Sequence, residues 1–509
     1  MRNPSVMKHS FARVPAAEIP RSAFDRSSGY KTTFDAGYLI PVFVDEALPG
    51  DTFNAKMTAF ARLATPLHPF MDNMYLDSFF FAVPIRLIWD NFQKFNGEQD
   101  NPADSTDFLV PTMTAPGGGY AAGSLSDYFG IPTGVASLQH MSLFHRAYNL
   151  IWNEWFRDQN LQNSVVVDKD DGPDTYTDYV LLKRGKRHDY FTSALPWPQK
   201  GPAVDLPIGD SAPVTGLGKL NQSFLTGAST VYETDGTGTV NYTSAAGIDA
   251  GAGAAYDFRV EEDPNNTGYP NIRADLSAAT AATINELRQA FQIQKLYERD
   301  ARGGTRYTEI IRAHFGVTSP DARLQRPEYL GGGSSPINVN PIAQTSSTDA
   351  TTPQGNLAAF GTSTLAGHGF TKSFTEHCVL IGLVSARADL TYQQGLPRMF
   401  SRSTRFDFYW PALSHIGEQT VLNKEIYADG SANDELVFGY QERYAEYRYK
   451  PSMITGQFRS NHGTPLDTWH LSQQFGSLPT LSSTFIEEDP PVDRVIAVPA
   501  EPHFLFDAY

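Results

Sequence analysis

Residues 186–201, KRHDYFTSALPWPQKG, contain the side chains whose types could support hydrolytic chemistry. His188, Asp189 and Ser193 match the base, the orienting acid and the nucleophile of a serine hydrolase. A catalytic set must also meet in space, and adjacent residues of an extended chain point to opposite sides. Ser193 also lacks the G-x-S-x-G turn that presents a serine nucleophile. The spacing therefore disfavours catalysis and leaves a nucleic-acid contact or an architectural corner.

The other reactive residue types are also poorly spaced for catalysis. Cys378 lies beside His377 at the start of the apolar run 377–386, where cysteine behaves as a small hydrophobic core residue. His140 and His145 are five residues apart and would not share a helix face well enough to chelate a metal. The sequence has no C-x-x-C, H-E-x-x-H, Walker A or EF-hand spacing. We expect no catalytic residues, no metal site and no cofactor.

Composition favours a turn-rich β protein and limits how it could bind nucleic acid. The 509 residues include 41 Gly and 34 Pro, with 12% aromatic and 19% charged residues. A net charge of −16 argues against nucleic-acid binding over the whole surface, since such proteins are usually basic. One cysteine allows no intrachain disulfide, which fits a reducing compartment. The sequence predicts neither a secretory signal nor a membrane span.

Two segments differ from the rest in charge and composition. Residues 1–31 carry six Lys or Arg and two acidic residues, and their prolines discourage helix, so we expect an extended basic arm. A frayed terminus is the alternative. Residues 205–282 are predicted to be a surface insertion, because 221–282 is rich in small and polar residues, with eight acidic and two basic residues. A short hairpin within it is expected.

Strand patterns occur early and late in the chain. Alternation over 52–66 predicts a half-buried strand with Lys56 and Arg62 on its polar face. Pro41 indicates an edge strand or a bulge in the first predicted strand. We predict further strands at 37–44, 74–84, 377–386, 405–410, 446–450 and 494–499. The two groups favour a β-sandwich whose sheets mix both halves of the chain, as in Greek-key and jelly-roll folds.

Helical spacing predicts two helical regions between the strand groups. The first spans 138–158 and carries several aromatic residues on its apolar stripe. The second spans 283–315, is broken at Gly303–Gly304 and ends at Gly316, a favourable residue after a helix. Residues 331–336 and 343–356 are predicted to be loops because of their glycine, serine and threonine content.

Long, non-repetitive segments resemble the major capsid proteins of gokushovirus-type Microviridae (the F-protein family), which are small tailless phages with circular single-stranded DNA. The segments include EIPRSAFDRSSGYKTTFDAGYLIPVFVDEALPGDTF (18–53), KRHDYFTSALPWPQKG (186–201) and GLPRMFSRSTRFDFYWPALSHIGEQ (395–419). The likeness covers the chain in family order except about 205–280 and 340–370. It implies a mainly β fold, an eight-stranded antiparallel viral jelly roll in two sheets with long helical and loop insertions.

The resemblance also implies how the chain is organised and where it acts. It implies one capsid domain over 1–509, with the strands and helical insertions in 32–204 and 283–509. Sixty copies would form a T=1 shell around the genome. The chain would have no enzymatic activity. It would assemble in the bacterial cytoplasm and form part of the virion. The implied partners are further copies of the chain, packaged single-stranded DNA, scaffolding, DNA-packaging and pilot proteins, and a host cell-surface receptor, without membrane insertion. The insertion would project near the three-fold axes and bind that receptor.

The resemblance gives the singled-out residues their expected roles. Pro196, Trp197 and Pro198 form a rigid corner, because each proline restricts itself and its predecessor, and Trp197 is expected to be a packing anchor in a subunit or DNA contact. Packing within one subunit is the alternative. The candidates to face DNA are Arg2, Lys8, Arg13, Lys186, Arg187 and Lys200. The last three could instead pair with carboxylates of a neighbouring subunit. The receptor candidates in the insertion are Tyr232, Tyr242 and Tyr256.

A different class of protein would share the strand-rich composition. A secreted β-sandwich that binds carbohydrate, or a glycosidase, needs no recognisable motif, because two carboxylates can lie anywhere in such a chain. The absence of a secretory signal counts against this alternative.

Overall fold

The structure is a computed structural model that describes residues 20–204, 284–318, 325–346, 354–414 and 416–509, with short strand segments inside 205–283. The chain divides into two compact units. The first unit contains residues 1–196 and 317–509, and the second contains residues 197–316.

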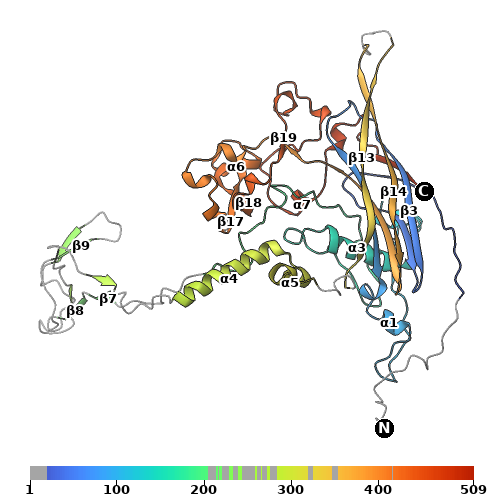
Figure 1. Cartoon of the computed structure of the whole chain (residues 1–509), viewed down its shortest axis with the longest axis horizontal. Helices are drawn as coiled ribbons and strands as arrows, with labels where there is room; N and C mark the ends of the chain where they lie inside the picture. Colours follow the sequence, from blue (N-terminus) through green and yellow to red (C-terminus); the bar gives the residue numbers. More distant parts are fainter. Residues whose placement is uncertain are drawn as a thin grey trace. The chain divides into compact units, whose positions relative to one another are not determined.

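Eight strands of the first unit form one antiparallel sheet in the order β1–β20–β3–β14–β13–β4–β15–β2. Figure 1 labels three neighbours of this order, β3, β14 and β13. The first half of β13 pairs with β4 and its second half with β14, so the sheet divides into two groups of four. We call β1–β20–β3–β14 the first sheet and β13–β4–β15–β2 the second sheet. The bounds are β1 Tyr30–Phe34, β2 Ile40–Ala47, β3 Thr52–Leu63, β4 Met74–Pro84, β13 Glu328–Ala343, β14 Leu357–Ser373, β15 Cys378–Ala388 and β20 Phe504–Ala508.

This strand order confirms the predicted fold class. The C-terminal strand β20 lies between β1 and β3, and the late strand β15 lies between β2 and β4, so both sheets mix the two halves of the chain. Eight antiparallel strands in two such sheets are the architecture of a jelly roll. Pro41 lies where the register between β2 and β15 shifts, and β2 is the last strand in the order, as the proline predicted.

The main core fills the space between the two sheets. Alternate residues of β3, including Ala59, Ala61 and Leu63, turn inward and are buried, which confirms the predicted alternation. Phe80 of β4 and Phe504 of β20 meet them from the other strands. Each large side chain buried in this way stabilises the fold by about 1.5–3 kcal/mol relative to leaving it in water.

Within the described part of the chain, other elements cover the outer face of the second sheet, whereas the outer face of the first sheet stays uncovered. Every residue of β15 is buried, because Val379, Ile381 and Leu383 face a second core while their neighbours face the first. The helix α3 (Leu143–Ile151) supplies Ala147 and Ile151 to this second core. In β3, by contrast, the residues of the outer face remain exposed. The sandwich therefore has one covered side and one bare side.

Shorter elements complete the first unit (Figure 1). Tyr190, Phe191, Val421 and Phe438 belong to a third buried cluster at the β17–β18 pair. The bounds are α1 Phe92–Phe95, β5 Thr112–Thr114, α2 Leu125–Tyr128, β6 Gln139–Met141, β16 Thr391–Tyr392, β17 Glu418–Leu422, α6 Asn423–Ile426, β18 Val437–Glu442, β19 Ser452–Met453 and α7 Ser483–Ile486.

The described residues of the second unit form two helices and short strand pairs. The helices are α4 Ile284–Gly303 and α5 Tyr307–Phe315, and Gly316 adopts a left-handed φ of 70° after α5, as predicted. The strands β9 and β10 pair as a hairpin within the predicted insertion. The strand bounds are β7 Val214–Thr215, β8 Leu217–Lys219, β9 Ser229–Tyr232, β10 Thr239–Tyr242, β11 Phe258–Val260 and β12 Arg273–Ala274. Among the described residues, no helix combines the length and apolar character needed to cross a membrane.

Several predicted elements were wrong in type or extent. Residues 405–410 and 446–450 contain short 3₁₀ turns instead of strands, and 494–499 follow a 3₁₀ turn and contribute only an isolated bridge. Residues 331–336, predicted to be a loop, lie inside β13. The helix predicted at 138–158 begins at Leu143, after the short strand β6, and ends in a π-helical turn over Trp152–Phe156.

Candidate functional site

The side chains that resembled a hydrolytic set instead build a turn. One carboxylate oxygen of Asp189 accepts hydrogen bonds from the backbone N–H groups of Phe191 (2.9 Å) and Thr192 (2.8 Å), and the other accepts from the Tyr392 hydroxyl (2.6 Å). The Ser193 hydroxyl donates to the backbone carbonyl of Asp189. His188 is exposed. The carboxylate thus orders the backbone, in the way Asp commonly stabilises turns.

The cysteine and the two histidines considered for catalysis or metal binding also have structural roles. Cys378 is buried in β15, as predicted, and burial raises the pKa of its thiol to about 12. The rings of His140 and His145 lie 5.2 Å apart, but their Nε2 atoms bond to the hydroxyls of Tyr120 (2.8 Å) and Ser126 (2.9 Å). Within the described part of the chain, no three His, Cys, Asp or Glu side chains are grouped so that they could hold a metal ion.

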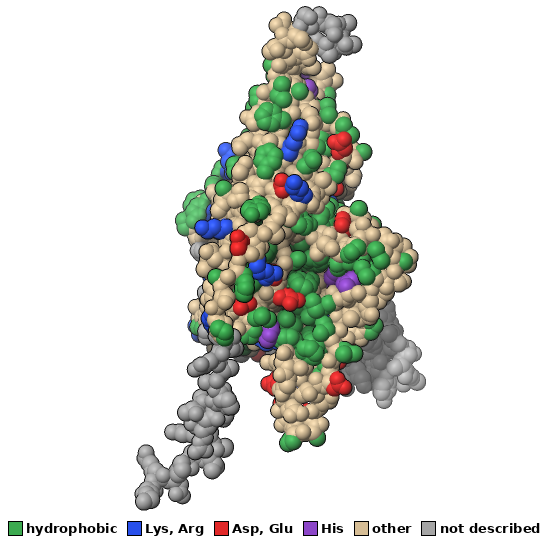
Figure 2. Space-filling model, turned by 90° about the vertical axis from the view of Figure 1, so that its right-hand side faces the viewer, with side chains coloured by type: hydrophobic (Ala, Val, Ile, Leu, Met, Phe, Trp, Pro, Cys, Tyr) green, Lys and Arg blue, Asp and Glu red, His purple; other side chains and the backbone are tan. Residues whose placement is uncertain are grey.

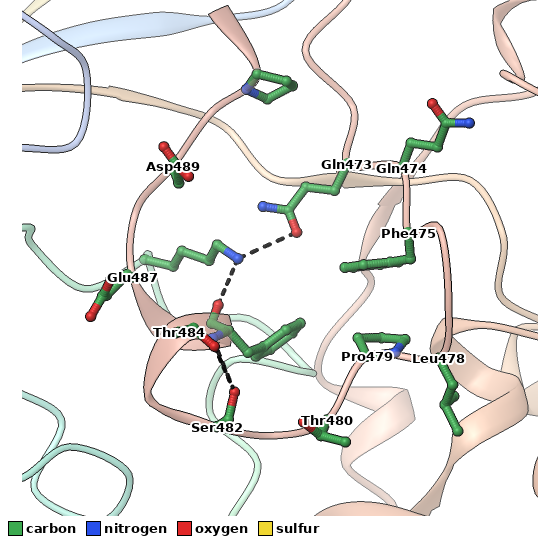
Figure 3. A pocket seen from close by; sticks show the side chains of 13 residues that line it. Gln473, Gln474, Phe475, Leu478, Pro479, Thr480, Ser482, Thr484, Glu487 and Asp489 are labelled. Carbon is green, nitrogen blue, oxygen red and sulfur yellow. Dashed lines mark hydrogen bonds between the residues drawn. The ribbon is translucent and has the colours of Figure 1, made fainter.

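Lys186, a predicted DNA contact, is buried inside the first unit. Its ammonium group donates to the backbone carbonyl of Phe485 (2.6 Å) and to Gln473 Oε1 (3.3 Å), and lies 4.6 Å from the centre of the Phe485 ring. Burial lowers the pKa of Lys186 to about 8, although nearby carboxylates favour the charged form. It borders an open hollow of about 430 Å³, in which Glu487 and Asp489 lie across from Phe475 (Figure 3).

Arg187 is exposed and borders a second hollow, of about 640 Å³. Its guanidinium lies 3.6 Å from the Asp389 carboxylate, so its charge is partly balanced. Aromatic and basic side chains dominate the lining, which includes Phe79, Phe81, Trp155, Phe156, Tyr329, Arg157 and Arg184. Aromatic rings can stack on the flat faces of nucleic-acid bases, and neighbouring cations can contact phosphates, so this lining could accept either group.

The predicted corner lies at the boundary between the two units. Pro196 ends the first unit and Trp197 begins the second, and both flanking prolines are exposed. Trp197 is half-buried, and the Lys200 ammonium lies 5.7 Å from the centre of its ring. The backbone N–H of Lys200 donates to the carbonyl of Tyr297 in α4 (3.2 Å). These contacts fix the start of the second unit against its first helix.

The other predicted contact residues are only partly described. Tyr232 ends β9 and Tyr242 ends β10, so their backbones belong to the hairpin of the insertion. Arg2, Lys8, Arg13 and Tyr256 lie outside the described residues.

The bare face of the first sheet combines basic and hydrophobic side chains. On β3, Lys56, Phe60 and Arg62 are exposed, and Phe60 stands opposite Thr364 on one side and Asp507 on the other. Lys31 of β1 reaches the edge of the same face, with its ammonium 3.7 Å from Asp507. Figure 2 views the molecule from the side on which β3 and β14 lie in Figure 1, and there basic side chains are interspersed with hydrophobic and acidic ones.

This face was only partly visible in the sequence. The alternation of β3 placed Lys56 and Arg62 together, but it gave no sign that the face would stay uncovered. Whether a face stays uncovered depends on where the segments between the strands pack, and α3 and its neighbours pack on the second sheet. The basic arm leads directly into β1 at the edge of the bare sheet, so the arm and this face are adjacent in the chain.

Comparison with known proteins gives a consistent family. Residues 12–509 match the family model described as capsid protein (F protein). The capsid protein VP1 of Bdellovibrio phage phiMH2K is 54% identical over 495 residues, covering 96% of this chain and 92% of the relative. VP1 of Chlamydia phage 1 is 47% identical over 99% of this chain and 96% of the relative, and VP1 of Spiroplasma virus 4 is 39% identical over 97% and 92%.

Proposed function

This chain belongs to the phage capsid protein (F protein) family, and from that premise we propose that sixty copies assemble into a T=1 shell around a circular single-stranded DNA genome. It is a structural, non-enzymatic capsid protein of the Microviridae type and a component of the virion. This assignment replaces the secreted carbohydrate-binding or glycosidase alternative. The proposal rests mainly on the family match, which spans 12–509, together with the jelly-roll strand order.

We propose that the bare face of the first sheet and the basic arm face the genome. Lys31, Lys56 and Arg62 supply local positive charge, and Phe60 offers a ring on which a base can stack. A chain with a net charge of −16 needs such a local surface for phosphate contact. The arm residues Arg2, Lys8 and Arg13 extend this charge along the chain. The exposed Arg187 and the half-buried Lys200 remain candidates for contact with DNA or with carboxylates of a neighbouring subunit.

Lys186 contributes differently in this proposal. Its ammonium group already donates to Phe485 and Gln473 inside the subunit. We therefore propose that Lys186 stabilises the fold beneath a DNA or subunit contact and does not bind a phosphate itself.

Trp197 remains the proposed packing anchor of the corner. The insertion 205–282, with Tyr232, Tyr242 and Tyr256, is proposed to bind the host receptor. Scaffolding, DNA-packaging and pilot proteins are proposed partners during assembly in the bacterial cytoplasm.

The deciding experiment is the native mass and the negative-stain image of the chain produced with its viral partner proteins. We expect closed shells of one size, each with the mass of sixty subunits. A discrete monomer or dimer under these conditions, with glycan binding or cleavage, would contradict the shell proposal.

A further inference from the structure

Residues 398–410 and 443–449 of the first unit present exposed aromatic and arginine side chains, which we call the aromatic–arginine surface. Phe400, Phe406 and Phe408 are 69%, 59% and 54% exposed. Large exposed apolar patches on a soluble protein usually mark an interaction site. The other exposed rings of this surface are Tyr409, Trp410, Tyr447 and Tyr449.

Arginine side chains hold several of these exposed rings in place. The Arg402 guanidinium lies 4.5 Å from the centre of the Tyr447 ring and 5.3 Å from that of Phe408. The Arg405 guanidinium lies 4.5 Å from the centre of the Trp410 ring, whose indole N–H donates to the Arg405 carbonyl (3.0 Å). Side chains that are ordered before binding lose less conformational entropy when a partner covers them.

The backbone beneath the rings is also fixed. The Asp407 carboxylate accepts from the backbone N–H groups of Ser403 (2.9 Å) and Thr404 (2.6 Å), which closes the turn that carries Phe406. The Tyr444 hydroxyl donates to the Phe406 carbonyl (3.1 Å). Tyr444 itself has a left-handed φ of 61°, an unusual conformation for a residue other than glycine. A buried tyrosine held in this conformation ties the two segments of the surface together.

The charges of this surface favour a protein partner over nucleic acid. Arg398 pairs with Glu425 (2.8 Å), and Arg402 lies 3.6 Å from Glu446. The surface holds five arginines, at positions 398, 402, 405, 443 and 448, and four carboxylates lie among them, those of Asp407, Glu425, Glu442 and Glu446, so only a small excess of cations is left for phosphate binding. Aromatic residues and arginine are also the types that contribute most binding energy in protein interfaces.

We propose that the aromatic–arginine surface is a contact between two copies of this chain. The inference rests on the proposed shell, because each shell subunit must bury part of its surface against neighbouring copies. The surface lies on the first unit, which carries the jelly roll, its rings and backbone are held by the contacts above, and carboxylates lie beside most of its arginines, features that suit a subunit contact.

A thiol-protection experiment tests this contact in intact particles. The only native cysteine, Cys378, is buried with a raised thiol pKa, so it should not react with a maleimide at neutral pH. A Phe406→Cys variant therefore carries one reactive thiol on the surface. Its labelling rate is measured in assembled particles and in dissociated, folded subunits. We expect labelling in particles to be at least about tenfold slower, since a subunit contact excludes reagent and water.

A pair of double variants gives an independent readout. Phe400→Ser with Phe406→Ser should reduce particle yield at least about tenfold, the effect of losing roughly 1.4 kcal/mol of association free energy. The thermal midpoint of the isolated subunit should not change, since both rings are exposed. The matched control is Leu109→Ser with Val180→Ser, two exposed residues outside the surface (82% and 51%), and it should keep wild-type particle yield.

The possible outcomes separate this inference from the capsid proposal. If wild-type particles form and Phe406→Cys reacts at the same rate in particles and in subunits, the contact does not exist. Wild-type yield of the Phe400→Ser, Phe406→Ser variant would overturn it as well. Normal shells with reduced DNA content would assign the surface to nucleic acid and also overturn it. If the wild-type chain forms no particles with its viral partners, the proposed shell fails instead.

Discussion

At the scale of single residues, Asp189 decides what the stretch 186–201 does. The same carboxylate that could have oriented a catalytic histidine accepts two backbone N–H groups and the Tyr392 hydroxyl. Its hydrogen-bonding capacity is therefore used to fix a turn and to join that turn to residues far along the chain. Sequence spacing correctly disfavoured catalysis here, but it could not reveal Tyr392, which is distant in sequence.

The buried Lys186 should make stability depend on pH in a specific window. Its pKa in the folded protein is about 8, below the ordinary lysine value of 10.5, so between these values the unfolded state binds more protons and stability rises with pH. We compare the unfolding free energy of the wild type with that of Lys186→Met from pH 7 to 10.5. The wild type should gain roughly 3 kcal/mol relative to the variant, at about 1.4 kcal/mol per pKa unit. A difference that stays constant or falls would show that Lys186 is not buried as described.

Trp197 should contribute to the heat stability of assembled particles. Its ring is half-buried and has Lys200 beside it, and the flanking prolines restrict the backbone around it. A Trp197→Ala variant should lose about 1–2 kcal/mol, because part of the ring's apolar burial is removed. Particle yield and the melting temperature of particles measure this loss. Unchanged yield and melting temperature would remove Trp197 from the contacts that support the shell.

At the scale of elements, alternation predicted strands correctly only where it reflected burial. In β3, Ala59, Ala61 and Leu63 alternate with exposed residues because one face covers the core. Residues 405–410 alternate too, but Asp407 caps a turn there and the aromatic rings point to solvent. The pattern is the same, and only the presence of a partner sheet separates the two cases.

The glycine-rich segment 331–336 shows the opposite error. It was predicted to be a loop, yet it runs inside β13 because glycine permits close approach between strands. A Cβ at Gly331 would clash with the backbone carbonyl of Gly369 in β14. The register with β4 also shifts between Tyr329 and Gly331. Composition alone could not separate a flexible loop from a tightly packed strand.

The candidate site was likewise only partly predictable. Local charge in the sequence predicted the basic arm and Arg187 as DNA contacts, and Arg187 is exposed in the structure. The burial of Lys186 depends on Phe485 and Gln473, almost three hundred residues away in sequence. The aromatic–arginine surface was hidden because its rings were assigned to strands. Contacts between residues far apart in sequence therefore determine both the burial of Lys186 and the aromatic–arginine surface, and neither could be predicted from local sequence.

The basic arm should govern DNA content more than shell formation. Replacing Arg2, Lys8 and Arg13 with alanine removes three cations that are proposed to contact phosphates. For single-stranded DNA this should lower the slope of log affinity against log salt by about 2. The amount of DNA packaged per particle should fall more than the yield of empty shells. Absorbance and particle mass together measure the DNA content and the particle yield.

A second variant tests the proposed genome face of the sandwich. Lys56→Ala with Arg62→Ala on β3 should act in the same direction as the arm variant, with a slope reduced by about 1.4. Lys424→Ala serves as the control, since that lysine is paired with Glu435 outside the bare face. Unchanged DNA content in both the arm variant and the β3 variant would contradict the proposed genome face.

At the scale of the whole chain, the fold separates a structural core from an N-terminal arm and an insertion that differ from it in charge. Among the described residues, the eight strands of the sandwich and the side chains of its main core lie outside 205–283. The net charge of −16 is unevenly distributed, with a basic arm and an acidic insertion. A shell that holds DNA inside and meets a host outside would use such a division, since cations are needed only where phosphates lie.

Removing residues 221–282 should therefore leave shells intact and impair attachment to the host. The main core and the eight-stranded sheet of the described chain are built from residues outside this segment, so the deletion keeps those contacts of the sandwich. We expect normal particle yield and a decrease in adsorption on the order of tenfold, equivalent to about 1.4 kcal/mol of binding free energy. Infectivity and adsorption are measured on the same particle preparation. Folded subunits that no longer form shells would instead make the insertion an assembly element, and unchanged adsorption would remove it as the receptor-binding segment.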